Sequence, residues 1–102
     1  MAYILIVDDD PDMAELLGHM TDILGYEHQY VATGAEAIAI CNQRAPDAIV
    51  LDVMLEDTDG WTVYRQLVSV TRAPIIFITA WRTGENRQKA ESLRADGFLA
   101  KP

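Results

Sequence analysis

The chain has 102 residues, enough for one domain, and half of them are hydrophobic, which excludes a disordered polypeptide. Its net charge of -8 argues against direct binding of a nucleic acid and favours basic partners or bound cations. The single cysteine cannot form an intramolecular disulfide, and neither a leader nor an apolar run of membrane length is present, so we expect a cytoplasmic protein with no membrane partner.

The first predicted strand covers residues 3–7, a continuous apolar run that is typical of parallel strands covered on both faces. The helix that follows has Asp10 as its N-cap, Pro11 at its first position and Gly25 as its stop. Its apolar residues recur every three to four positions, as in an amphipathic helix: Met13, Leu16, Leu17, Met20, Ile23 and Leu24.

Two further strand–helix pairs are predicted in the middle of the chain. A weak strand at 29–32 precedes a short helix at 35–43, and a strongly apolar strand at 48–51 precedes a helix at 61–70. The inward residues of the earlier helix are expected to be Ala35, Ile38, Ala39 and Cys41. Those of the later helix are expected to be Val63, Leu67 and Val70.

The last part of the chain predicts a buried strand at 75–78 and a weak strand at 98–100. Between them, residues 82–94 contain only Ala90 and Leu93 as apolar anchors, which are too few for a firmly docked helix. The alternation of strands and helices predicts an α/β fold with a five-stranded parallel sheet.

Charged and polar residues follow the ends of the predicted strands: Asp8, Asp9, Asp52, Thr79 and Lys101. The loops beyond the carboxyl ends of parallel strands converge at a crevice, where ligands bind. Two carboxylates about 4 Å apart repel by about 4 kcal/mol at an effective dielectric constant near 20, so three in one crevice favour a bound cation. Because magnesium prefers oxygen ligands, the sequence predicts a magnesium site, with a hydroxyl and an ammonium placed to hold phosphoryl oxygens.

Four segments resemble the receiver domain of bacterial two-component response regulators: VDDDP (7–11), VLDVMLEDTDG (50–60), FITA (77–80) and FLAKP (98–102). Together and in this order they cover nearly the whole chain. The resemblance implies one receiver domain over residues 1–102, with a flavodoxin-like, doubly wound parallel sheet of strand order 2-1-3-4-5. Receiver domains continue into a fifth helix, which is absent from this sequence, so we expect a fold truncated after strand 5.

The resemblance also implies a phosphorylation site. Asp52 would be the phosphoacceptor, and a histidine kinase or phosphotransfer protein would donate the phosphoryl group. Mg²⁺ would be bound by Asp9, Asp52 and the main-chain carbonyl of Met54, and Asp8 would act through water.

The resemblance further implies a conformational switch. Thr79 and Lys101 would bind the phosphoryl oxygens, and Phe98 would move with Thr79 on activation. The protein would then be a signalling switch and not a turnover enzyme, since it would catalyse only its own phosphorylation and dephosphorylation.

Two other functions are weighed against this one. The first is a degenerate receiver that binds partners without phosphorylation; the intact set of site residues opposes it, and the missing fifth helix favours it. The second is a magnesium phosphohydrolase of the haloacid dehalogenase type, which needs a second aspartate two residues after the first. Met54 occupies that position, so we reject this reading.

Several other residues have structural interpretations. We interpret Asp10 and Asp59 as helix caps and Asp57 as a loop residue. The isolated residues His19, His28 and Cys41 suggest no metal ligand or nucleophile.

Self-association is expected from the missing fifth helix. In a sheet of this order the first helix alone would cover one face, because the second, third and fourth helices cover the other. A contiguous apolar patch of more than a few hundred Å² is seldom left in water on a monomer. We therefore expect self-association through the uncovered face.

Overall fold

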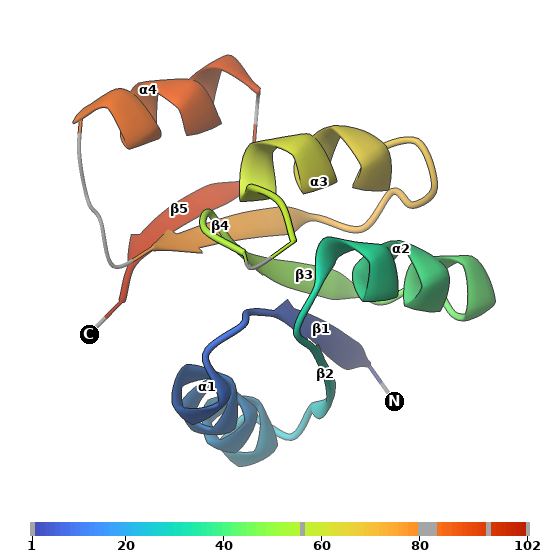
Figure 1. Cartoon of the computed structure of the whole chain (residues 1–102). Helices are drawn as coiled ribbons and strands as arrows, with labels where there is room; N and C mark the ends of the chain where they lie inside the picture. The colour runs from blue at the N-terminus through green and yellow to red at the C-terminus, as the bar shows by residue number, and fades with distance from the viewer. Residues whose placement is uncertain (1, 56, 80–83, 94, 102) are drawn as a thin grey trace.

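The computed structural model describes residues 2–55, 57–79, 84–93 and 95–101, which form a parallel sheet with helices on both faces (Figure 1). The strands are β1 (Tyr3–Val7), β2 (Glu27–Val31), β3 (Ala48–Asp52), β4 (Ile75–Thr79) and β5 (Gly97–Ala100). The helices are α1 (Pro11–Ile23), α2 (Gly34–Gln43), α3 (Gly60–Leu67) and α4 (Gly84–Ser92). The strand order is β2-β1-β3-β4-β5, so the flavodoxin-like topology predicted from the sequence is confirmed.

The main core lies between the sheet and the helices α2 and α3, which share one side of the sheet with α4, while α1 lies on the other side (Figure 1). Leu5, Leu51 and Phe77 from the strands are fully buried there, as are Val63 and Leu67 from α3. The three predicted apolar strands are found where expected, because strands covered on both faces are apolar at nearly every position.

Helix α1 packs against the sheet in a way that its sequence pattern did not predict. Its buried residues are Ala14, Gly18 and Thr21, whereas the apolar residues with the largest exposed fractions are Leu16, Met20, Ile23 and the C-cap residue Leu24. A Cβ atom at Gly18 would lie 2.7 Å from Nε2 of His28 on β2, so the helix approaches the strand too closely for a larger side chain. The amphipathic stripe therefore faces largely away from the core.

Other element boundaries differ from the predicted ones at the edges of the sheet. Strand β2 begins two residues earlier than predicted, since its pairing with β1 sets Glu27 opposite Tyr3 and its side chains carry no apolar run. Helix α3 ends at Leu67, and Val70 follows in a turn whose N–H donates to the Leu67 carbonyl.

The prediction of the inward face of α2 was partly wrong. The helix buries Gly34, Ala37 and Cys41, while Ala35 and Ala39 are exposed. Ile38 is half-buried against the core. Small residues at the buried positions let α2 lie close to its neighbours, which a count of apolar residues does not reveal.

Within the described ranges, no helix has both the length and the apolarity that crossing a bilayer requires.

Candidate functional site

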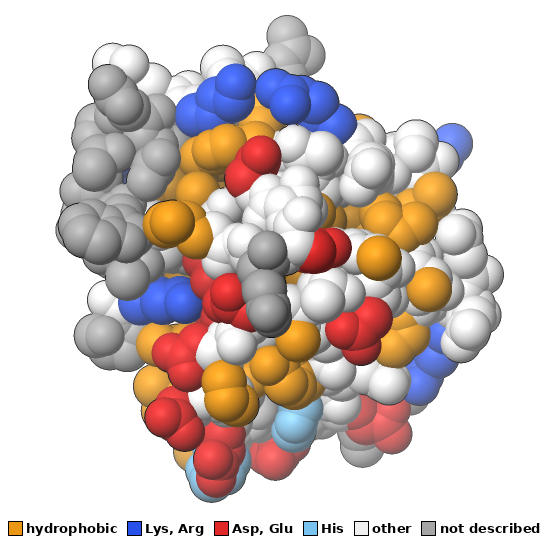
Figure 2. Space-filling view, in the orientation of Figure 1, with side chains coloured by type: hydrophobic (Ala, Val, Ile, Leu, Met, Phe, Trp, Pro, Cys, Tyr) orange, Lys and Arg blue, Asp and Glu red, His pale blue; other side chains and the backbone are white. Residues whose placement is uncertain are grey.

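The predicted site residues lie at the edge of the sheet where the strands end. Asp8 and Asp9 follow β1, Asp52 is the last residue of β3, Thr79 is the last residue of β4, and Lys101 follows β5. Parallel pairing brings these strand ends together, since Val7 pairs with Leu51, Asp52 with Ile78, and Thr79 with Ala100. On the face of the molecule seen in Figure 1, acidic side chains gather beside α1 (Figure 2).

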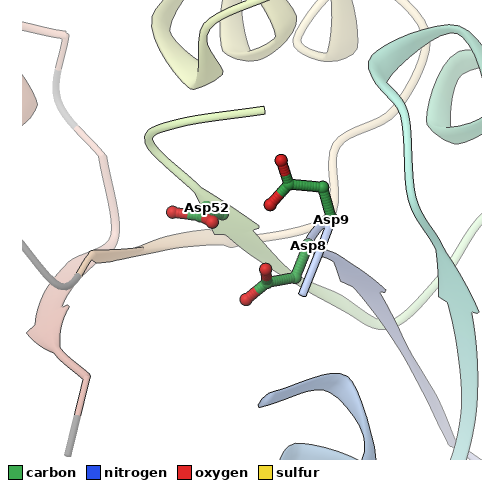
Figure 3. Close-up of side chains that lie close together, drawn as sticks. All are labelled: Asp8, Asp9 and Asp52. Atoms are coloured by element: carbon green, nitrogen blue, oxygen red, sulfur yellow. The ribbon is translucent and has the colours of Figure 1, made fainter. Parts of the chain in front are cut away.

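Three carboxyl groups surround a common space at this edge (Figure 3). One oxygen each from Asp8, Asp9 and Asp52 lies within 4.8 Å of the others. Asp8 and Asp52 are buried and Asp9 is exposed, so the cluster opens to solvent on the side of Asp9.

Local hydrogen bonds show which aspartates belong to the cluster and which of them cap helices. Asp8 Oδ1 accepts a hydrogen bond from the N–H of Asp10 (2.9 Å), which fixes the turn after β1. Asp10 in turn accepts from the N–H of Asp12 (3.0 Å) and caps α1, and Asp59 caps α3 by accepting from the N–H of Thr62 (2.8 Å). Both capping predictions are confirmed.

Lys101 joins two of the buried carboxylates. Its Nζ donates a hydrogen bond to Oδ2 of Asp52 (3.0 Å), and it lies equally close, 3.0 Å, to Oδ2 of Asp8. The contact between Lys101 and Asp8 is an ion pair whose angles do not fit a hydrogen bond. Oδ2 of Asp8 therefore accepts no hydrogen bond within the described part of the chain. The N–H of Lys101 donates to the Thr79 carbonyl (2.8 Å), which fixes the lysine backbone beside the end of β4.

The pKa values of Asp52 and Lys101 are both raised, but for different reasons. Burial raises the pKa of Asp52 to about 6, and the nearby charge of Asp8 adds to this rise, although hydrogen bonds from Lys101 and from the Met54 N–H oppose it. Burial by itself would lower the pKa of Lys101, but the close approach of the Asp8 and Asp52 carboxylates raises it above its ordinary value. The lysine is therefore held in its charged form.

The donor set of the cluster fits a hard divalent cation. Among the described residues, the three carboxylates have the ammonium of Lys101 as their positive partner. Negative charge therefore exceeds positive charge in the space that the carboxylates surround. Oδ2 of Asp8 is buried and accepts no hydrogen bond from the residues that the structure describes, and the ligand atoms are all oxygens, as magnesium prefers. Met54 is close to the cluster, since its N–H donates to Oδ1 of Asp52 (3.2 Å), and metal binding by its carbonyl stays a prediction.

The two residues expected to act as a switch lie on neighbouring strands. Thr79 is fully buried at the end of β4. Phe98 on β5 pairs in register with Phe77 and is half-buried against the main core, and the guanidinium of Arg87 on α4 lies 6.0 Å from the centre of its ring.

Sequence reasoning missed a contact of Asp57. Its position in a loop was predicted correctly, but its carboxylate accepts hydrogen bonds from the N–H groups of Gly34 (3.1 Å) and Ala35 (3.4 Å) at the start of α2. The sequence gives only a weak signal for this contact. The N–H groups at the start of a helix need acceptors, but the acidic residue that supplies them lies more than 20 positions away.

We expect Asp52→Asn to stabilise the metal-free protein at pH 8 by about 2 kcal/mol, with a gain that disappears as the pH falls towards 4. The pKa of Asp52 is above its ordinary value, so the folded state binds more protons than the unfolded state between pH 3.8 and about 6. The contribution of this carboxyl group to stability therefore falls as the pH rises through that interval. Denaturant unfolding in chelator at several pH values measures this difference, and a gain that does not change with pH would contradict the prediction.

Comparison with known proteins identifies the family. Residues 4–102 match the response regulator receiver domain. The chain is 34% identical over 105 residues to the DNA-binding dual master transcriptional regulator RpaA of Synechocystis sp., a match that covers all of this chain and 44% of that protein. It is 38% identical over 100 residues to the response regulator MprA of Mycobacterium sp., covering 97% of this chain and 44% of that protein. The chain thus spans less than half the length of these curated relatives.

Solved structures agree in fold over the whole chain. A two-component response regulator from Clostridium difficile superposes with a TM-score of 0.94 at 29% identity, covering 100% of this chain and 84% of that one. The chemotaxis protein CheY4 of Vibrio cholerae gives a TM-score of 0.84 at 29% identity, covering 100% of this chain and 88% of that one. The chain therefore belongs to the receiver-domain family of two-component response regulators, in which an aspartate is generally phosphorylated.

Proposed function

We propose that this chain is a phosphorylatable receiver in which Asp52 accepts a phosphoryl group from a histidine kinase or a phosphotransfer protein, in a magnesium-dependent reaction. The observation that carries the proposal is the cluster of Asp8, Asp9 and Asp52, whose oxygens lie within 4.8 Å of one another, with the Lys101 ammonium beside two of them. A degenerate receiver would not need a half-buried lysine between two buried carboxylates.

In the proposed reaction a carboxylate oxygen of Asp52 attacks the phosphorus of the donor, the bond from phosphorus to the donor breaks, and an acyl phosphate forms. With a pKa of about 6, Asp52 is mostly ionised above neutral pH and is able to act as the nucleophile. Asp9, Asp52 and the main-chain carbonyl of Met54 would hold Mg²⁺, and Asp8 would act through water. When bound, the metal would neutralise charge on the phosphoryl oxygens.

Lys101 and Thr79 would bind the new phosphoryl oxygens. Phosphorylation moves negative charge from the carboxylate of Asp52 outward to these oxygens, and the ammonium of Lys101, now 3.0 Å from Asp52, would follow the charge. The hydroxyl of Thr79 would supply a hydrogen bond from the end of β4.

The output of this reaction would be a change of conformation. Thr79 and Phe98 would move together, because they lie on adjacent paired strands and Phe98 is only half-buried. The protein would act as a switch and would catalyse only its own phosphorylation and dephosphorylation. Its partners would be histidine kinases or phosphotransfer proteins, and its cytoplasmic location stays a prediction.

We expect incubation with magnesium and acetyl phosphate to add one phosphoryl group, detected by intact-mass spectrometry. The adduct should be absent in Asp52→Asn and strongly reduced when a chelator replaces magnesium. Asp10→Asn is the matched control, because asparagine also caps helices and this carboxylate is outside the cluster. If Asp52→Asn is still modified, or the parent chain never is, the degenerate receiver becomes the better description.

Magnesium should raise the melting temperature of the parent chain, because a ligand that binds only the native state stabilises it. The gain is about 1.4 kcal/mol when free magnesium is ten times its Kd. Asp9→Ala should abolish this increase, whereas Asp12→Ala, which removes an exposed carboxylate from α1, should preserve it. An equal melting temperature in millimolar magnesium and in chelator would show that the cluster does not bind the metal.

Self-association through the sheet face on the side of α1, at strands β3 to β5, stays a prediction. Leu99 on β5 pairs in register with Ile78, outside the main core, and is 57% exposed. Sedimentation at micromolar concentrations should show an average mass that rises with concentration and returns to that of a monomer in the variant Leu99→Lys. A parent chain that is monomeric throughout would remove this idea.

A further inference from the structure

Asp57 connects the loop after β3 to a helix that is distant in the sequence. Its Oδ1 accepts a hydrogen bond from the N–H of Gly34 (3.1 Å), and its Oδ2 accepts one from the N–H of Ala35 (3.4 Å). These are the first two residues of α2. The carboxylate therefore lies at the amino end of the helix, where exposed N–H groups and the helix dipole favour a negative charge.

The amino end of α2 has two acceptors, one local and one from the loop. Thr33 is the local N-cap: its Oγ1 accepts from the N–H of Glu36 (3.2 Å), and its carbonyl accepts from the N–H of Ala37 (3.1 Å). Asp57 supplies the acceptors for the two remaining N–H groups of the first turn. The two capping residues thus serve the same helix end, but only Asp57 also belongs to the loop that follows the phosphoacceptor.

Further hydrogen bonds of the described loop residues shape the loop and join it to β4, but none of them reaches α2. The N–H of Leu55 donates to the Thr58 carbonyl (3.1 Å), and the N–H of Gly60 donates to the Val53 carbonyl (2.6 Å). The N–H of Val53 donates to the Ile78 carbonyl on β4 (3.1 Å), so these bonds leave the contact with α2 to Asp57.

The absence of a side chain at Gly34 permits the close approach. A Cβ atom there would lie 2.5 Å from Cγ2 of Val63 and 3.2 Å from Cγ2 of Thr58. The loop, α2 and α3 therefore meet with little space at this point, and the carboxylate of Asp57 makes the polar part of the contact.

We infer that Asp57 is a positioning residue for the metal site, an inference that rests on the function proposed above. The loop that it ties to α2 begins at Asp52 and contains Met54, whose N–H donates to the Asp52 carboxylate. Holding the loop tip fixes the backbone that supplies the proposed carbonyl ligand and one hydrogen bond to the phosphoacceptor. Outer residues that orient ligands in this way commonly change metal affinity when they are replaced.

The test compares three variants of the chain: Asp57→Ala, Asp57→Asn and Thr33→Ala. Asp57→Ala removes both acceptors, and we expect its Kd for magnesium, measured by calorimetry, to rise about tenfold. Asp57→Asn has the same charge as Asp57→Ala but keeps one acceptor oxygen. A lower Kd in Asp57→Asn than in Asp57→Ala would show that the hydrogen bond contributes to magnesium affinity in addition to the charge. Thr33→Ala removes the other cap of α2 and should leave the Kd unchanged.

A second readout uses the metal-free protein and does not depend on activity. Amide hydrogen exchange of the loop at 53–59 should become faster in Asp57→Ala but not in Thr33→Ala, whereas exchange at the start of α2 should become faster in both. An unchanged magnesium Kd in Asp57→Ala, or an equal rise in Thr33→Ala, would overturn the inference while leaving the proposed function intact. A parent chain that binds no magnesium would overturn both.

Discussion

The contact of the Lys101 ammonium with Asp8 and Asp52 is the interaction on which the site depends. Both carboxylates are buried at the end of a sheet whose strands are largely apolar, and an unpaired charge in such a place is costly. The lysine lies 3.0 Å from each of them, so it compensates two buried charges at once. Because the three residues come from the ends of three different strands, the pairing of β1, β3, β4 and β5 determines the position of each.

The same interaction makes the site responsive to chemistry at Asp52. Asp52 is a buried carboxylate with a raised pKa, and among the described residues Lys101 is the cation that pairs with it. Asp9 adds a third carboxylate on the open side, so negative charge exceeds positive charge in this described part of the site. A divalent ion or a phosphoryl group changes the charge that Lys101 meets, and the backbone of Lys101 is bonded to the Thr79 carbonyl. In the proposed reaction, a change of charge at Asp52 would therefore act first on the paired ends of β4 and β5.

The sequence predicted the structure best in the strands that are buried on both faces, because nearly every residue there has to be apolar. The apolar runs of β1, β3 and β4 were predicted nearly to the residue, and the residues after them then had to meet at one edge of the sheet. The packing of α1 was predicted wrongly, since a close contact made by Gly18 has no apolar signature. The contact of Asp57 was missed for a related reason: it joins positions that become neighbours only after the sheet has formed.

Two groups of aspartates in this chain differ in their electrostatic surroundings, and counting charges in the sequence does not separate them. Asp10, Asp57 and Asp59 neutralise amino ends of helices, where their charge is locally favourable. Asp8 and Asp52 are buried beside the ammonium of Lys101, and their charges would be costly there without a positive charge close to them. Since Asp57 lies on the loop that follows Asp52, the helix-capping group and the proposed metal-binding groups share one backbone segment. If Asp52 is the phosphoacceptor, the position of α2 and the geometry around that residue are for that reason expected to depend on each other.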